Sequence, residues 1–319
     1  MDFRTRIEIP PSPLRITYDS RLLLLGSCFA ENIGQKLRNG CFRTDVNPCG
    51  IQYNPLSVAG TLRLLAEEKQ LGPERLLEQN GLWVSLRHHG SFSGSDRNTC
   101  LTGINSRLQA GARNLREADI LLITFGTAWV YRYRKTGEIA ANCHRFPAAD
   151  FDRFRLTPEE IVAGYEKLIT TLSALNPALK IVFTVSPIRH WKEGAHGNQL
   201  SKSVLLLAID ELAGRFEQIS YFPSYEIVLD ELRDYRFYDT DMLHLSGQAV
   251  EYIWERFRET YLDRTTDELL KRVEKIQKSL QHRPFRPDTP EYEQFKKHLL
   301  REMEEVRAVN QNIAFSSGL

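Results

Sequence analysis

The chain has 319 residues, of which 42% are hydrophobic and 26% are charged, so it can bury the core of a globular domain. Its 42 basic and 41 acidic residues nearly cancel, which argues against nucleic acid or an anionic membrane as a partner. These values favour a small-molecule or glycan substrate.

Cysteine usage and the lack of long apolar segments bear on where the protein resides. The five cysteines are an odd number without a C-x-x-C pair, which is typical of free thiols in a reducing compartment. Residues 1–13 carry charges and three prolines where a secretory signal needs an apolar stretch, and no later run is long enough to span a membrane. We therefore expect a cytoplasmic protein without a membrane partner.

Short apolar runs alternate with helical patterns along the first half of the chain. The run of leucines after Arg21 is ended by Gly26, and the apolar run that begins at Ile120 is ended by Gly126. The spacing predicts strands over 21–25, 82–86 and 120–125, and helices over 30–38, 56–71 and 107–118.

The second half continues the alternation. Residues 135–138 separate two strand-like runs, 130–134 and 139–142, and indicate a hairpin, while Thr157 and Pro158 mark the start of a helix that ends at Leu175. Further strands are predicted over 181–185 and 219–222, and further helices over 201–217 and 247–261. This order favours an α/β fold with a parallel sheet covered on both faces.

Beyond Asp263 the chain changes character. Two charged amphipathic helices are predicted over 268–280 and 291–309, separated by a proline-rich segment, 282–290. We therefore expect a main α/β domain over 1–262 and a helical arm over 263–319. The first arm helix has an apolar stripe, which must cover either the body or a second copy of the chain in a homo-oligomer: Leu269, Leu270, Val273, Ile276 and Leu280.

The carboxyl ends of parallel strands gather ligand-binding residues at one edge of a sheet. Ser27 follows the first predicted strand, where a hydroxyl faces the cleft and the start of the next helix offers free N–H groups to an oxyanion. Asp241 and His244 lie three positions apart on the loop before helix 247–261, so the carboxylate can orient the imidazole. Ser27 as a simple helix cap is an equal alternative.

These two loops together resemble the SGNH, or GDSL-like, hydrolase superfamily, and within it the GSCFA family. The family's name string stands at Gly26–Ala30. Other stretches that look like family motifs are Asn47–Pro55, Thr124–Tyr131, Asn142–His144, Phe183–His190, Gly197–Lys202 and Glu231–Tyr238. The resemblance runs from about Leu22 to about Tyr261 and leaves the tail outside.

The resemblance implies a three-layer α/β/α flavodoxin-like fold and metal-free chemistry on an acyl or acetyl ester. It implies an acyl-enzyme on Ser27, with His244 as base and Asp241 as its orienting carboxylate. It names no substrate. An acyltransferase of the same mechanism and a catalytically weak binding protein of this fold remain alternatives.

One position departs from the superfamily pattern, in which an asparagine after a glycine donates to the oxyanion. Here Gly126 is followed by Thr127. The substitutes we consider are Thr127, Asn54 and Asn142, with Gly50 as a backbone donor because a glycine lets the chain approach an oxyanion closely.

Four residues are candidates for substrate binding. Arg189, His190 and Trp191 follow the strand 181–185, where the guanidinium suits an acidic group and the indole suits a sugar face, and His144 follows the hairpin. The histidines lack the spacing of a metal site, so no metal is expected. Ser201 and Lys202 are interpreted as a helix-capping serine beside a solvated lysine.

Overall fold

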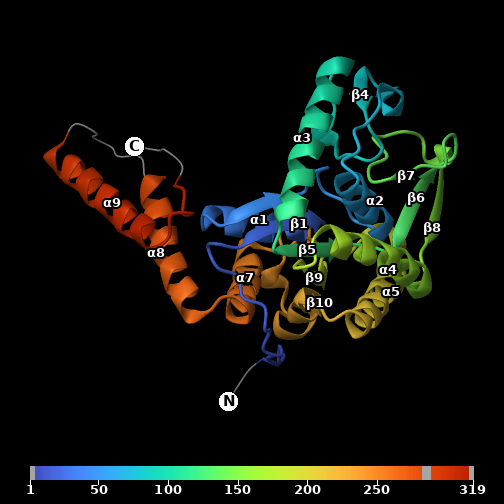
Figure 1. Cartoon of the computed structure of the whole chain (residues 1–319). Helices are drawn as coiled ribbons and strands as arrows, with labels where there is room; N and C mark the ends of the chain where they lie inside the picture. Colours follow the sequence, from blue (N-terminus) through green and yellow to red (C-terminus); the bar gives the residue numbers. More distant parts are fainter. Residues whose placement is uncertain (1–3, 282–288, 316–319) are drawn as a thin grey trace.

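The computed structural model describes residues 4–281 and 289–315. At its centre is a five-stranded parallel sheet in the order β10-β9-β5-β1-β2 (Figure 1). Its strands are β1 (Arg21–Gly26), β2 (Arg43–Val46), β5 (Ile120–Phe125), β9 (Lys180–Val185) and β10 (Ile219–Tyr221). β5 is buried along its whole length, which explains why all of its residues except Thr124 are apolar.

Successive side chains of the sheet enter two separate cores, because strand residues alternate between faces. Leu23 and Ile123 pack into one core, whereas Leu22 and Leu122 pack into the other. Helices α2 (Pro55–Ala66), α3 (Arg97–Glu117), α4 (Pro158–Leu175) and α5 (Gly194–Arg215) cover the first face, and α1 (Cys28–Asn39) and α7 (Gly247–Tyr261) cover the second. The predicted three-layer α/β/α class is confirmed.

Several helices begin earlier than their sequence patterns predict, and the difference is largest for α3 and α5. α3 begins at Arg97 rather than at 107, because the Asp96 carboxylate accepts a hydrogen bond from the Thr99 N–H and caps the helix. α5 begins at Gly194 rather than at Ser201, so Ser201 lies inside the helix. Glycine is a poor helix former, which hides this first turn of α5 from the sequence pattern.

Smaller elements surround the sheet. The predicted hairpin is present as β6 (Trp129–Tyr133) and β7 (Ile139–Ala140), and it gains a third antiparallel strand, β8 (Phe151–Arg155). A two-stranded unit pairs β3 (Leu77–Gln79) with β4 (Leu82–Val84). The remaining short helical turns are η1 (Pro73–Arg75), η2 (Gly90–Phe92), η3 (Ala148–Asp150), η4 (Trp191–Glu193), α6 (Ser224–Glu226), η5 (Ile227–Glu231) and η6 (Tyr235–Phe237).

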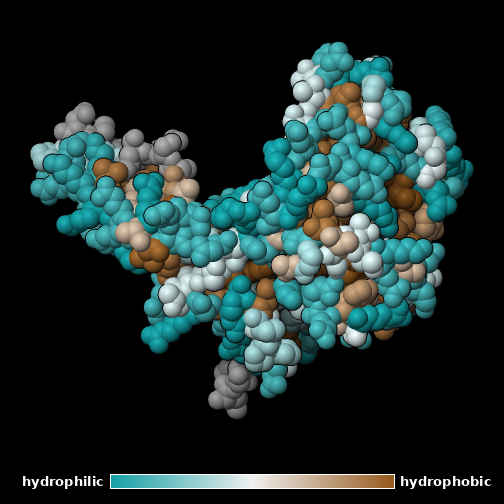
Figure 2. Space-filling model, viewed as in Figure 1, coloured by the Kyte–Doolittle hydropathy of each residue, from teal (hydrophilic) through white to brown (hydrophobic). Residues whose placement is uncertain are grey.

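The arm consists of α8 (Arg264–Leu280) and α9 (Pro290–Val309), which lie side by side beyond α7 (Figure 1). The apolar stripe of α8 is covered within the same chain. Leu270 and Val273 are buried in the same core as Phe42, and the Gln277 amide donates to the Cys41 thiol at 3.0 Å. Figure 2 shows a mostly hydrophilic outer surface over the arm.

No helix within residues 4–281 or 289–315 has the length and apolar character to cross a membrane. Over the same residues all five cysteines are free.

Candidate active site

Ser27 stands between the first strand and the first helix. The preceding Gly26 has φ 135°, and a Cβ there would lie 2.1 Å from the Thr124 carbonyl oxygen, so only glycine allows this turn. The Ser27 hydroxyl accepts a hydrogen bond from the Phe29 N–H at 3.3 Å and caps α1, and the residue is buried. Ser27 is therefore the N-cap of α1. Because its oxygen accepts this hydrogen bond, the hydroxyl hydrogen can still be donated to another group.

Asp241 and His244 form a pair on the loop before α7. The distance between His244 Nδ1 and Asp241 Oδ2 is 2.5 Å, and Asp241 Oδ1 accepts from the N–H groups of Leu243 and His244. These hydrogen bonds, led by the one from the imidazole, lower the pKa of Asp241 to about 2. The carboxylate is therefore ionised at neutral pH and holds Nδ1 of the imidazole, so Nε2 is the nitrogen left for the serine proton.

The two loops meet at one cavity of about 280 Å³. Ser27 and His244 both line it, although they are 217 positions apart (244 minus 27) and come from opposite ends of the domain. Residues 4–281 and 289–315 show no hydrogen bond between the two side chains. Such contacts are often long in a site without substrate and tighten when it binds.

Thr127 lies behind the cavity. Its N–H donates to the Tyr53 carbonyl at 3.0 Å, and its hydroxyl lies 3.1 Å from the Ser201 hydroxyl and accepts from the Trp129 N–H. Thr127 is buried and does not line the cavity, unlike its neighbour Gly126. Both of its candidate donor groups thus have partners inside the protein.

The other three candidate donors also have partners elsewhere. Asn54 caps α2 and bonds to Ser57, while Asn142 accepts from the His144 N–H. The Gly50 N–H donates to the Asn47 carbonyl at 2.8 Å. None of these residues lines the Ser27 cavity. The structure therefore does not bring them to the reacting groups.

A Thr127→Val substitution tests this reading. Because the hydroxyl bonds to buried protein groups, we expect the free energy of unfolding to fall by about 1–2 kcal/mol while kcat on an ester changes less than about 3-fold. Urea denaturation and steady-state kinetics on the same sample measure the two quantities. A kcat loss of about 10-fold or more at unchanged KM would instead identify the hydroxyl as an oxyanion donor.

The segment after β9 brings three of the four substrate-binding candidates to the cavity. Arg189, His190 and Trp191 all line it, and the indole of Trp191 is 55% exposed. His144 does not. Its Nε2 lies 2.8 Å from the Ser85 carbonyl oxygen, and burial lowers its pKa, so it is a neutral group within a loop cluster.

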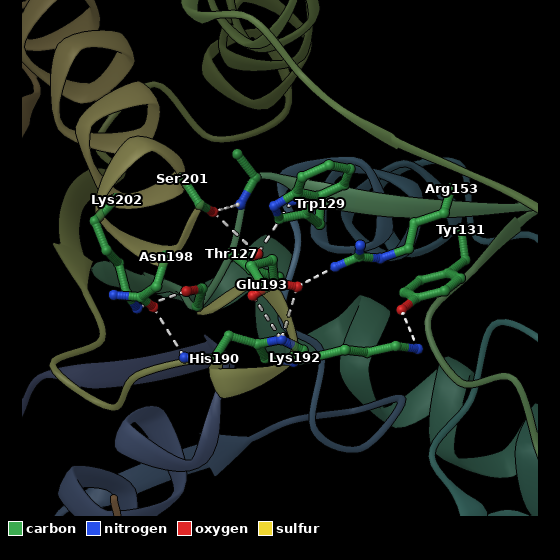
Figure 3. A network of polar contacts seen from close by, with 12 residues as sticks. Thr127, Trp129, Tyr131, Arg153, His190, Lys192, Glu193, Asn198, Ser201 and Lys202 are labelled. Atoms are coloured by element: carbon green, nitrogen blue, oxygen red, sulfur yellow. Dashed lines mark hydrogen bonds and ion pairs between the residues drawn. The ribbon is translucent and has the colours of Figure 1, made fainter. Parts of the chain in front are cut away.

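A polar network of side chains from α5, β6 and β8 surrounds this segment (Figure 3). The Glu193 carboxylate, whose side chain is 1% exposed, lies 3.0 Å from His190 Nδ1 and pairs with Arg153 of β8. The His190 N–H donates to Asn198 of α5 at 2.9 Å. Arg153 also lies over the Trp129 ring, 4.1 Å from its centroid. The cavity wall is thus fixed by residues of α5, β6 and β8.

Lys202 is the most deeply buried member of the network. Its Nζ donates to the carbonyl oxygens of Gly126 and Ser186, each at 2.6 Å, and the residue is 0% exposed. The interpretation of Lys202 as a solvated lysine is therefore wrong, and so is that of Ser201 as a helix cap. Burial lowers the pKa of Lys202 to about 7, and nearby Glu193 opposes this shift.

Two residues beside Ser27 lie within motifs noted in the sequence, but their side chains were not among the predicted site groups. The Cys28 thiol lies 3.6 Å from the Tyr53 hydroxyl, and both residues line the cavity. Burial, with a smaller contribution from Cys28, raises the pKa of Tyr53, so the phenol keeps its proton. Tyr53 lies in an irregular segment before α2, where no periodic pattern marks it.

No group of three or more histidine, cysteine or acidic side chains suited to a metal ion occurs among the residues that the structure describes.

Comparison with known proteins places the chain in a family. No curated protein matches it. Two solved structures are similar at low TM-scores. One is provisionally described as a platelet activating factor from Streptococcus pneumonia, and it has 16% sequence identity and a TM-score of 0.37. The match covers 75% of this chain and 83% of the chain of that structure. A carbohydrate esterase family 3 protein from Talaromyces cellulolyticus has 11% identity and a TM-score of 0.35, covering 79% and 98%.

Two family models match most of this chain. The GSCFA family model matches residues 21–257. A second model, described as the C-terminal domain of GSCFA domain proteins, matches residues 273–319, so the expectation that the tail lies outside the resemblance is wrong. The chain belongs to the GSCFA family.

Proposed function

We propose that this protein is a serine esterase that forms an acyl-enzyme on Ser27. The observation that carries the proposal is the meeting of Ser27 with His244 at one cavity, where Asp241 holds the imidazole through Nδ1. This arrangement supplies a hydroxyl, a base and an orienting carboxylate in the roles that acyl transfer needs.

The proposed reaction has two steps. The Ser27 oxygen attacks the ester carbonyl as its proton passes to His244 Nε2, and the tetrahedral oxyanion then expels the alcohol, which takes that proton. In the second step a water molecule gives a proton to His244 and attacks the acyl-enzyme. The second oxyanion then expels the Ser27 oxygen, which takes that proton, and the acid is released. Asp241 keeps its negative charge throughout and stabilises the imidazolium.

We place the oxyanion between the start of α1 and Tyr53. The Cys28 N–H lies in the first turn of α1, where the helix dipole favours negative charge, and it has no acceptor among residues 4–281 and 289–315. The Tyr53 phenol lies beside Cys28 and stays protonated, so it can donate. It would take the role that an asparagine has in the wider superfamily.

Replacing Tyr53 with phenylalanine tests the side-chain donor. We expect kcat to fall about 10- to 100-fold with little change in KM, because the hydrogen bond forms mainly in the transition state. Steady-state kinetics on a short-chain aryl ester measure both constants. A matched control is Tyr292→Phe, in the distant arm helix α9. Unchanged kcat in the Tyr53 variant would remove the phenol from the oxyanion site.

The proposed substrate is an acyl or acetyl ester of a small molecule or glycan. Arg189, His190 and Trp191 at the cavity support a polar, ring-bearing substrate, with His190 held in place by Glu193. We further infer a reducing compartment such as the cytoplasm. The five unpaired cysteines support that inference.

A serine-directed fluorophosphonate probe tests the proposal directly. We expect it to label the protein at neutral pH and to leave the Ser27→Ala variant unlabelled, because only an activated hydroxyl attacks the phosphorus. An unlabelled native protein would contradict the esterase and favour a binding protein of this fold.

A further inference from the structure

A second cavity, of about 640 Å³, adjoins the first. The two share Arg189, Trp191 and Leu243 as common walls. Val228 and Leu232, both 1% exposed, lie in the wall of the second cavity, which we call the side groove. It is built mainly by the segment 228–243, which follows the last strand and runs into the loop that carries Asp241 and His244.

Large apolar side chains stand exposed around the side groove. Tyr235 is 75% exposed, Trp191 55% and Met242 53%, although burial of such groups is strongly favoured. Met242 also has φ 59°, a strained conformation for a residue with a side chain. Strain and exposed apolar surface together mark a binding site rather than a packing fault.

Charge in the side groove is balanced except at one residue. Arg233 pairs with Asp230, Asp234 with Arg236, and Asp241 with His244. Arg189 is half-buried at the junction of the two cavities, and within residues 4–281 and 289–315 it makes no hydrogen bond or ion pair. An unpaired, partly desolvated guanidinium is suited to a carboxylate or phosphate of a ligand.

We propose that the side groove binds the alcohol half of the substrate, and that this half is a ring-bearing group with a negative charge, such as a sugar acid. Tyr235 and Trp191 offer faces for the ring, and Arg189 offers a partner for the charge. The choice of the alcohol half rests on the proposed esterase function.

The position of the side groove supports the alcohol half in particular. Asp241, Met242 and Leu243 line it, so it lies against the loop that carries His244. In acyl transfer the imidazolium gives its proton to the leaving oxygen, which must therefore lie next to the histidine. A leaving group that starts at His244 in the first cavity can thus extend past Leu243, which both cavities share, into the side groove.

The ligand class is tested by binding, without any need for catalysis. The probes are phenyl β-glucuronide and the uncharged phenyl β-glucoside, measured by titration calorimetry. We expect the glucuronide to bind more tightly to the native protein. Tyr235→Ala should weaken both probes about 3- to 10-fold, since a stacked ring is lost. Arg189→Gln should weaken the glucuronide about 10-fold and leave the glucoside unchanged.

Leu207→Ala is the matched control, because Leu207 is an exposed apolar residue of α5 that lines neither cavity. It should bind both probes as the native protein does. Absence of saturable binding, or equal affinity for the two probes, would overturn the ligand class. So would a loss in the Leu207 variant as large as that in the Tyr235 variant.

Two esters that carry their rings on opposite sides of the ester bond test whether the side groove binds the alcohol half. 1-Naphthyl acetate carries its rings on the alcohol, whereas ethyl 1-naphthoate carries them on the acyl group. We expect Tyr235→Ala to raise KM about 3- to 10-fold for the first ester only. A rise for the second ester instead would assign the side groove to the acyl half. If the native protein hydrolyses neither ester, the esterase proposal and the alcohol half fail together, while the binding result still decides the ligand class.

Discussion

Replacing Ser27 with alanine is expected to lower kcat/KM on short-chain aryl and acetyl esters by at least about 10³-fold, because a nucleophile has no substitute in acyl transfer. The fold should survive. The lost hydroxyl also caps α1, and loss of a cap costs about 0.5–2 kcal/mol, which lowers the melting temperature by only a few degrees in a domain of this size.

Ester kinetics and thermal melting on one preparation measure both effects. Ser203→Ala is a suitable control, because Ser203 donates only to the Gln199 carbonyl of its own helix. It should match the native protein in both measurements. Undiminished esterase activity in the Ser27 variant would show that another group is the nucleophile.

The second large effect is expected at Lys202. Substitution by methionine keeps an unbranched side chain that is one atom shorter, and it removes the donor shared by the Gly126 and Ser186 carbonyls. Both residues line the cavity, and these carbonyl oxygens are at present turned toward the ammonium. Once released they can turn toward the oxyanion and repel it. We expect kcat to fall about 10-fold or more, with a smaller change in KM.

The same substitution changes how stability depends on pH. The pKa of Lys202 is about 7 in the folded protein, against about 10.4 in an unfolded chain, so between these values the unfolded state binds more protons. The free energy of unfolding contributed by this group therefore rises with pH across that window, by up to about 1.4 kcal/mol per pH unit.

Urea denaturation at pH 6, 7, 8 and 9 measures this dependence. We expect the native protein to gain more stability toward pH 9 than Lys202→Met does, so the deficit of the variant is largest at high pH. Lys167→Met on α4 removes an exposed lysine and should keep the native slope. Parallel slopes for the native protein and the Lys202 variant would show that Lys202 does not titrate in this range.

Local signals were enough to predict the fold class and to single out the residues proposed to react, whereas the roles of these residues came from the resemblance to the GSCFA family. A strand, a glycine and a helix cap lie consecutively in sequence around Ser27, and Asp241 and His244 share one loop, so no distant contact is needed to notice them. The order of strands and helices likewise follows from local periodicity.

What the sequence hides depends on contacts between distant segments. Tyr53 reaches the cavity because its carbonyl accepts from the N–H groups of Gly126 and Thr127, more than seventy positions away. Lys202 lies on the buried face of α5. The helix begins at Gly194, well before the predicted start at Ser201, so the sequence pattern did not place Lys202 on that face. The side groove likewise combines the segment 228–243 with Arg189 and Trp191, which come from a distant loop.

The position of α1 against the far end of the chain has a consequence for how the protein is made. Phe29 and Ile33 of α1 share a core with Ile253 and Phe257 of α7 and with Leu270 of α8, and Ile16 pairs with Leu262. During synthesis α1 emerges well before α7 and α8, the helices against which its apolar face packs. A nascent chain therefore exposes that apolar face until α7 and α8 have been synthesised, and the cavity that Ser27 and His244 line forms only then.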